Sequence, residues 1–391
     1  MTYDKAFFDA GIDRAGTRSN KWAAKNIMQE GTVPLWVADM DFACAEPIRQ
    51  ALTRRAEHAC YGYTFFDESD FLAAAGFWKR RHHLDLLPDQ MILLSTVVSG
   101  LRACIQTMTQ NGDGVIIQTP VYGPFIRCVE ESGRVVLDAR LKHEAGGRYT
   151  MDLDAVEDFL KKGARLMVLC SPHNPVGRCW TRDELRALLL LLNRYGAKLV
   201  SDEIHADFVY APAVFVPVLS LDEAPIDTVS LISASKTFNI AGLKQAIAVC
   251  RDQETLEEIS RYLERSGADC GNIFALEATR AAYNECDSWL DGVLSYLEGN
   301  QATLLELIEE LLPHAVLSPM EATYLAWIDI RPYEIPQCEI GERCREHKVA
   351  LSDGQFFGAS AGEGFMRINY GCPRSQLLEG VHRFSHAIKG A

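Results

Sequence analysis

The chain has 391 residues, 48% of them hydrophobic, so it is long enough to bury a large core and to form two or three domains. Its formal net charge is −14, which argues against nucleic-acid binding because that function requires clustered basic residues. Its 12 cysteines form no Cys-x-x-Cys pair and no cluster with histidine, so we expect buried reduced thiols and no metal site.

The start of the chain lacks the pattern of a secretory signal, since residues 1–5 are polar and no basic stretch precedes an apolar one. The longest apolar run, near 185–192, is too short to span a bilayer and fits a buried helix face. We therefore expect a cytoplasmic protein without a membrane partner.

Seven short apolar runs predict the strands of one sheet. Helical patterns such as 152–161 and 181–194 fall between several of them, and Thr181 with Glu184 makes a capping box at the start of the second. Apolar strands that alternate with helices indicate an α/β fold with a mostly parallel central sheet covered by helices on both faces. The strands are expected at 91–95, 115–118, 135–138, 166–170, 198–201, 228–232 and 246–250.

The pattern changes from about residue 281 onward. A long helical stretch at 290–312 is followed by strand-like runs at 324–328 and 364–369. We predict a large domain over residues 41–280 and a smaller C-terminal α/β domain over residues 281–391.

Three polar residues each follow a predicted strand, at the edge of a parallel sheet where ligands bind. Lys236 follows small hydroxyl residues and can form a Schiff base with an aldehyde cofactor. Asp202 can keep a pyridine nitrogen protonated, and Asn174 can donate a hydrogen bond to a ring hydroxyl. Together these residues match the needs of pyridoxal 5'-phosphate.

Each of these residues also has a plainer interpretation. An Asn-Pro-x-Gly motif is usually a turn, an aspartate after a strand is most often a helix cap, and a single lysine is usually a solvated surface charge. The three residues in this order, each after an apolar run, favour the cofactor site.

Two further segments can contribute to such a site. Val98 and Ser99 follow a predicted strand and open a helical pattern at 101–109, so their N–H groups can bind a phosphate, although an ordinary strand-to-helix turn explains them as well. Tyr122 lies in a loop after the strand at 115–118 and can stack on a pyridine ring, or it can simply pack in the core.

The chain resembles the fold-type I pyridoxal phosphate enzymes, the aspartate aminotransferase superfamily, and within them the cystathionine β-lyase or C–S lyase branch of the MalY/PatB type. The resemblance runs nearly end to end. Motifs that carry it include Pro34-Leu-Trp-Val-Ala-Asp39-Met-Asp-Phe42, Tyr61-Gly-Tyr63-Thr64, Pro120-Val-Tyr122-Gly-Pro, Ser171-Pro-His-Asn-Pro-Val-Gly177, Ser201-Asp-Glu-Ile-His205, Ser235-Lys-Thr-Phe-Asn239 and Arg367-Ile-Asn369.

The resemblance implies roles for further residues. Ser233, Ser235 and Lys244 would face the phosphate, and Arg367 would bind the substrate α-carboxylate. Tyr63 resembles a tyrosine that reaches the phosphate from a second subunit, which implies a homodimer with shared sites. Residues 1–40 would join the smaller domain.

The resemblance leaves two histidines without a firm role. His205 stands where many members of the superfamily have a tyrosine that donates to the ring oxygen, so it is a candidate cofactor ligand whose role is open. His173 is expected to shape its loop.

The resemblance also implies the activity. The leading hypothesis is β-elimination on sulfur-bearing L-amino acids such as cystathionine or cystine, which releases a thiol, pyruvate and ammonia. The alternatives are an aminotransferase of the same superfamily, or a lyase with an added regulatory role in binding another protein, as some relatives of this branch have.

Overall fold

The computed structural model describes residues 2–24, 27–268 and 271–390. Its largest element is a seven-stranded sheet with the strand order β2-β10-β9-β8-β7-β3-β4. Only β10 runs antiparallel to its neighbours, so the predicted α/β fold with a mostly parallel sheet is confirmed. The strands are β2 (Met91–Leu94), β3 (Gly114–Ile117), β4 (Val135–Asp138), β7 (Leu166–Cys170), β8 (Lys198–Asp202), β9 (Val229–Ile232) and β10 (Ala246–Cys250).

Helices cover both faces of this sheet because its strands are apolar on both sides. In β7, Val168 belongs to one core cluster and its neighbours Met167 and Leu169 to the other, as the alternation of side chains along a strand requires. The first cluster includes residues of α5 (Val97–Met108), α6 (Pro124–Glu131) and α10 (Gln253–Ser266). The second includes residues of α3 (Glu46–Glu57), α4 (Glu68–His82), α7 (Leu153–Lys161), α8 (Arg182–Tyr195) and α11 (Ile273–Glu285).

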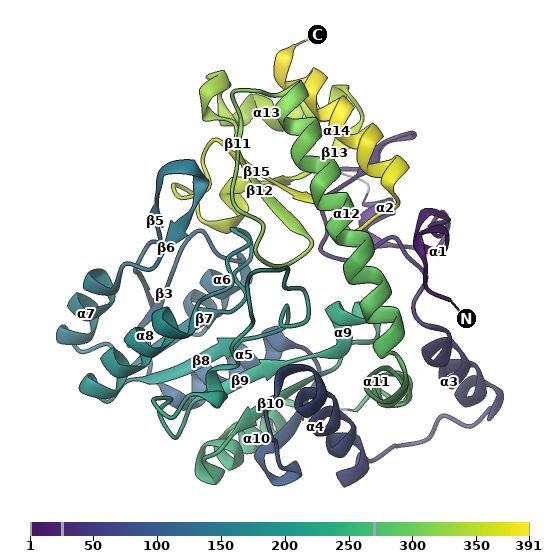
Figure 1. The fold of residues 1–391 in the computed structure, drawn as a ribbon. Helices are drawn as coiled ribbons and strands as arrows, with labels where there is room; N and C mark the ends of the chain where they lie inside the picture. The colour runs from purple at the N-terminus through teal and green to yellow at the C-terminus, as the bar shows by residue number, and fades with distance from the viewer. Residues whose placement is uncertain (1, 25–26, 269–270, 391) are drawn as a thin grey trace.

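A second, antiparallel sheet lies at the other end of the molecule, and the long helix α12 (Asp287–Leu311) runs between the two regions (Figure 1). Its strand order is β11-β12-β15-β14. The elements are β11 (Val316–Leu317), β12 (Leu325–Asp329), β14 (Ser352–Asp353) and β15 (Phe365–Asn369), with α13 (Gln337–Glu346) and α14 (Arg374–Lys389) beside them. A separate two-stranded hairpin joins β5 (Lys142–His143) to β6 (Tyr149–Thr150).

The N-terminal segment is attached to this second region. Strand β1 (Val33–Pro34) pairs in parallel with β13 (Val349–Ala350), and α1 (Lys5–Asp9) contacts α12. Phe8 of α1 is fully buried and makes edge-to-face contact with Phe42. Helix α2 (Asn20–Ala23) follows. The domain boundaries at residues 40 and 280 stay a prediction.

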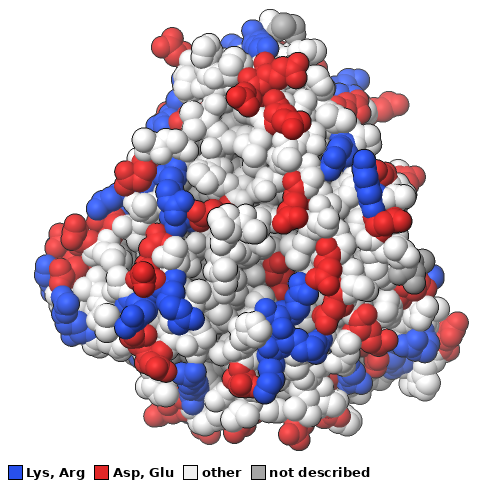
Figure 2. Space-filling model, in the orientation of Figure 1, with Lys and Arg blue, Asp and Glu red and all other residues white. Residues whose placement is uncertain are grey.

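Two surface properties bear on the predicted partners. Among the described residues, no helix is both long and apolar enough to cross a bilayer. Figure 2 shows acidic and basic side chains interspersed over one face of the molecule.

Candidate active site

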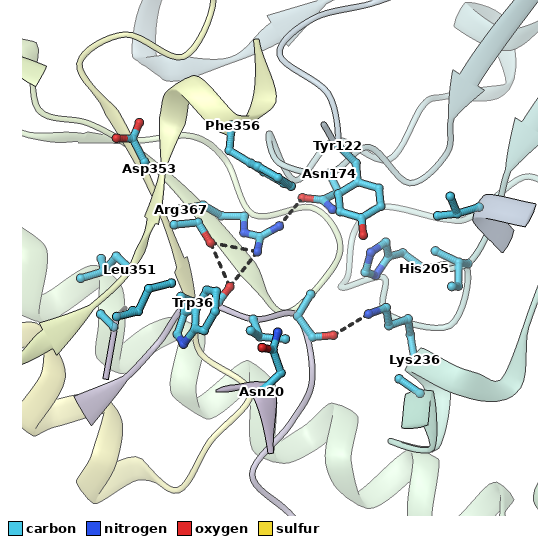
Figure 3. Close-up of a pocket in the computed structure, with 18 of the residues that line it drawn as sticks. Asn20, Trp36, Tyr122, Asn174, His205, Lys236, Leu351, Asp353, Phe356 and Arg367 are labelled. Carbon is cyan, nitrogen blue, oxygen red and sulfur yellow. Dashed lines mark hydrogen bonds between the residues drawn. The ribbon is translucent and has the colours of Figure 1, made fainter. Parts of the chain in front are cut away.

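A cavity of about 700 Å³ lies at the carboxyl ends of β7, β8 and β9. It brings together residues from the large sheet, from the second sheet and from the segment around Trp36 (Figure 3). Nine of the residues named from the sequence line it: Val98, Tyr122, Asn174, Asp202, His205, Ser235, Lys236, Lys244 and Arg367.

Lys236 lies in the short helix α9 (Ala234–Thr237), directly after β9. Its Nζ donates a hydrogen bond to the Ala38 carbonyl oxygen at 2.6 Å. Burial lowers the pKa of Lys236 to about 8; the negative charges of Asp39 and Asp202 act against this shift, and Arg367 adds to it. A lysine with this pKa loses its proton readily near neutral pH, as a nucleophile or general base must.

Asp202 ends β8 and is only 5% exposed. Its Oδ1 accepts the backbone N–H of Ile204 at 3.1 Å, and no described residue donates to its Oδ2. Burial raises the pKa of Asp202 to about 7, while the Ile204 N–H and Lys236 lower it. Such a carboxylate is stabilised by a cationic N–H donor, and a protonated pyridine nitrogen is one.

Arg367 on β15 is 4% exposed, and no carboxylate among the described residues pairs with it. Its Nη1 donates to Asn174 Oδ1 at 3.0 Å, and its Nη2 donates to the Trp36 carbonyl at 2.7 Å. Its Nε is buried and has no hydrogen-bond partner within residues 2–24, 27–268 and 271–390. Burial lowers the pKa of Arg367 to about 10. A buried guanidinium without a counter-ion favours a carboxylate ligand, and it also turns the amide N–H groups of Asn174 away from itself.

The two histidines lie in different environments. His205 lines the cavity, and its Nδ1 has no partner in the described part of the chain. Burial, helped by the charges of Lys236 and Arg367, lowers the pKa of His205 to about 3, so the ring is neutral. The ring of His173 is fully buried, and its Nε2 lies 2.9 Å from the Pro120 carbonyl oxygen. This contact agrees with a role for His173 in shaping its loop.

An anion can be bound at the start of α5, as the sequence predicts. Thr96 caps this helix, and the backbone N–H of Ser99 donates to Thr96 Oγ1 at 3.0 Å, so Ser99 is occupied by the cap. Val97 and Val98 keep the free N–H groups of the first turn. Lys244, which is exposed and has no ion pair among the described residues, also lines the cavity.

Three predicted residues do not line the cavity: Ser99, Ser233 and Tyr63. The hydroxyl of Ser233 caps α9 by accepting the Ser235 N–H at 3.0 Å, and it donates to the Gln245 carbonyl at 2.6 Å. Tyr63 is fully exposed on the surface. Within one chain it therefore contributes nothing to the cavity.

Several residues that the structure places here have no role predicted from the sequence. Trp36, Leu351 and Phe356 line the cavity, and the Ala38 carbonyl contacts Lys236. Trp36 and Ala38 belong to a motif that carried the family resemblance. Ala38 contributes its backbone carbonyl oxygen, and side-chain type alone does not predict such a contribution.

These residues fit pyridoxal phosphate. The cavity offers a lysine amine, a buried carboxylate with a free oxygen, an oriented amide and, at one end, a cation with free helix N–H groups. In the same order, these groups can bind the aldehyde, the ring nitrogen, the ring hydroxyl and the phosphate of that cofactor.

Comparison with known proteins agrees with this fit. The family model "Aminotransferase class I and II" matches residues 32–384. Cystathionine beta-lyase PatB of Bacillus subtilis is 36% identical over 97% of this chain and 99% of its own length. The crystal structure of cystalysin from Treponema denticola, which contains a pyridoxal 5'-phosphate cofactor, has a TM-score of 0.94 and 30% identity and covers both chains fully. A PLP-bound putative aminotransferase from Clostridium difficile has a TM-score of 0.94 and 35% identity over 97% of this chain and 99% of its own.

The chain therefore belongs to the class I and II aminotransferase family, and the predicted family and fold type are confirmed.

The raised pKa of Asp202 predicts how pH affects stability. In protein free of any cofactor, the folded state keeps the Asp202 proton up to about pH 7, whereas an unfolded aspartate loses it near pH 4. The folded state thus loses stability as pH rises through this interval. We expect the free energy of unfolding of Asp202→Asn to rise relative to wild type between pH 5 and 7.5, by about 2.5 kcal/mol, and then to level off.

Urea unfolding of the cofactor-free protein across this pH range measures the difference. Asp222→Asn, at an exposed aspartate, is the matched control and should show no such trend. A difference for Asp202→Asn that does not change with pH would contradict the raised pKa.

Proposed function

We propose that this protein is a pyridoxal phosphate-dependent carbon–sulfur β-lyase. It splits L-amino acids that carry sulfur on Cβ, with water, into a thiol, pyruvate and ammonia. One observation carries the proposal: a single cavity holds a lysine with a lowered pKa, a buried carboxylate and a buried arginine. Among the residues that the structure describes, one oxygen of that carboxylate has no donor and the arginine has no carboxylate partner. The relative from Bacillus subtilis, named a cystathionine beta-lyase, supports the reaction type.

The chain's own residues divide the work. When bound, the cofactor supplies the electron sink that makes the substrate Cα–H bond acidic. Arg367 binds the substrate α-carboxylate through its unpartnered Nε and orients the Cα–H bond toward Lys236. Lys236, as a neutral amine, takes the Cα proton. Asp202, Asn174 and the neutral His205 hold the cofactor ring, and Val98, Ser235 and Lys244 hold its phosphate.

The second candidate is an aminotransferase, which needs the same proton removal followed by return of a proton to the cofactor. The putative aminotransferase from Clostridium difficile, 35% identical to this chain, is the observation in its favour. An added role in binding a regulatory protein stays a prediction, as do the cytoplasmic location and the absence of a nucleic-acid partner.

A substrate panel separates these activities. We expect pyruvate, ammonia and a free thiol from cystathionine and cystine without any added keto acid, because elimination needs no amino acceptor. Pyruvate is measured with lactate dehydrogenase and thiol with a disulfide reagent. Turnover that requires a keto acid and releases no thiol would assign the protein as an aminotransferase instead.

Lys236→Ala should lower kcat by several orders of magnitude, because it removes both the covalent attachment of the cofactor and the base. Steady-state pyruvate release measures the loss, and the yellow colour of the wild-type protein should disappear. Lys161→Ala, at an exposed lysine, is the control and should keep wild-type rates. Undiminished turnover in Lys236→Ala would assign the base elsewhere.

We also propose that the protein is a homodimer in which Tyr63 reaches the cofactor phosphate of the partner subunit. Tyr61, Tyr63 and Phe65 are all exposed on one short segment, and exposed apolar clusters of this kind mark interaction surfaces. Such a segment is suited to contact a second copy of the chain.

Heterodimers of Lys236→Ala and Tyr63→Phe subunits test the shared site. If Tyr63 crosses the interface, one site carries both defects and the other carries none, so one near-normal site per heterodimer should reappear. If Tyr63 serves its own subunit, each site carries one defect and activity stays at the mean of the parents. A fully active monomer by light scattering would also exclude the shared site.

A further inference from the structure

The segment 36–42, called here the strap, crosses the site outside any helix or strand. Its backbone contacts both residues that handle the substrate in the proposed function. The Ala38 carbonyl accepts hydrogen bonds from Lys236 Nζ at 2.6 Å and from the Tyr324 hydroxyl at 3.0 Å. The Trp36 carbonyl accepts from Arg367 Nη2 at 2.7 Å. A shift of the strap therefore moves the groups that orient Lys236 and Arg367 together.

Two asparagines fix the strap to the same elements that carry Lys236 and Arg367. Asn239, three residues after Lys236, accepts the Met40 N–H at 3.0 Å and donates to the carbonyls of Met40 and Phe42 at 2.9 Å each. Asn369, two residues after Arg367, donates to the carbonyls of Val37 and Asp39. The strap is thus held mainly by side chains, together with a backbone hydrogen bond from the Asp41 N–H to the Gly371 carbonyl at 2.9 Å.

A cluster of four charges locks the strap from the N-terminal side. Arg14 makes two parallel hydrogen bonds of 2.9 Å to the carboxylate of Asp39 and a third of 2.8 Å to Asp41. Lys21 is fully buried, with its ammonium 2.7 Å from Asp41 and 3.1 Å from the Asp39 carbonyl. Removing one partner from such a cluster leaves an uncompensated charge, so these four groups hold each other and the strap in place.

We propose that Asp39 is a positioning residue for Lys236: through the strap it holds the Ala38 carbonyl as the acceptor that orients the Lys236 amine toward the substrate Cα proton, and its charge supports the ammonium formed when that proton arrives. This inference rests on the proposed function. One N–H of the neutral amine donates to the Ala38 oxygen, which leaves the nitrogen lone pair free to take the proton from Cα. The proton moves from carbon to Nζ, and the electron pair of the broken C–H bond stays with the substrate, where the bound cofactor would accept its charge.

The charges around Lys236 show why Asp39 is needed. Arg367 disfavours the ammonium, and Asp202 and Asp39 favour it. His205 is neutral, and burial keeps the hydroxyls of Tyr122 and Tyr324 protonated by raising their pKa. When Asp202 is occupied by the cofactor ring and Arg367 by the substrate carboxylate, the charge of Asp39 still favours the ammonium form of Lys236.

The test uses two variants of opposite charge. Asp39→Asn removes a negative charge, and Arg14→Met leaves the Asp39 charge without its main partner, while both loosen the strap. We expect the pKa of Lys236 to fall in Asp39→Asn and to rise in Arg14→Met, each by about 0.5 or more. The full-length, cofactor-free protein is treated with acetic anhydride across pH 6–10, and acetylation of Lys236 is followed by peptide mass spectrometry. Asp13→Asn removes an exposed neighbouring charge and should cause no shift.

The cofactor-loaded protein gives a second readout. Asp39→Asn should lower kcat for pyruvate release about tenfold or more with KM changed less than about twofold, and a substrate deuterated at Cα should slow it further than it slows wild type. Shifts of the same sign in both variants, or none, would overturn the proposal and leave the strap a purely structural element. If Asp39→Asn does not fold, the direction of the shift in Arg14→Met decides the question alone.

The two proposals fail in different ways. A wild-type protein that releases no pyruvate from any sulfur amino acid would end the lyase assignment. The acetylation measurement does not depend on that activity and would still report on Asp39 and Lys236.

Discussion

The whole site depends on three parallel strands that lie side by side. The register pairs Cys170 of β7 with Asp202 of β8, and Asp202 with Leu231 of β9. Because adjacent strands are about 4.8 Å apart, the residues that follow them are brought within reach of one small molecule. Asn174, Asp202 and Lys236 are distant in sequence, yet this pairing alone makes them neighbours. A shift of one residue in the register of β8 would place the Asp202 side chain on the opposite face of the sheet, away from the cavity.

The electrostatic balance of the cavity follows from what is buried there. Four basic side chains line the cavity, namely Lys236, Lys244, Arg345 and Arg367, against the two acidic side chains of Asp202 and Asp353, while His205 stays neutral. A cavity of this kind carries excess positive charge when empty, which favours anionic ligands such as phosphate and carboxylate. The anion-binding start of α5 and the exposed Lys244 extend the same preference to the far end of the cavity.

Much of the fold could be predicted from the sequence because its signals are local. All seven strands of the large sheet appear within one residue of their predicted bounds, and the capping box of Thr181 and Glu184 is present. Five of the residues that line the cavity could be predicted because each follows an apolar strand run: Val98, Tyr122, Asn174, Asp202 and Lys236. The other four, His205, Ser235, Lys244 and Arg367, were named from the family resemblance. The roles of these residues stay predictions.

Contacts that depend on long-range packing could not be predicted. Ser99 and Ser233 have the right residue type, but helix caps occupy their hydroxyls. The Ala38 carbonyl oxygen and Lys236 are in contact although 198 positions separate them in the sequence. No sequence pattern predicts which backbone oxygen makes such a contact. Whether Tyr63 completes a site depends on a second chain, which lies beyond what any pattern within one chain can show.

The strap also restricts which residue types can occupy position 239. The backbone of Asn239 has a φ of 57°, a left-handed conformation that glycine tolerates best and asparagine better than most residues. Its side chain also makes three hydrogen bonds to the strap. Glycine would keep the conformation and lose the bonds, whereas glutamine would strain the backbone and overreach the bonds. Neither substitution preserves both the backbone conformation and the hydrogen bonds, so we expect asparagine to be retained at this position during evolution.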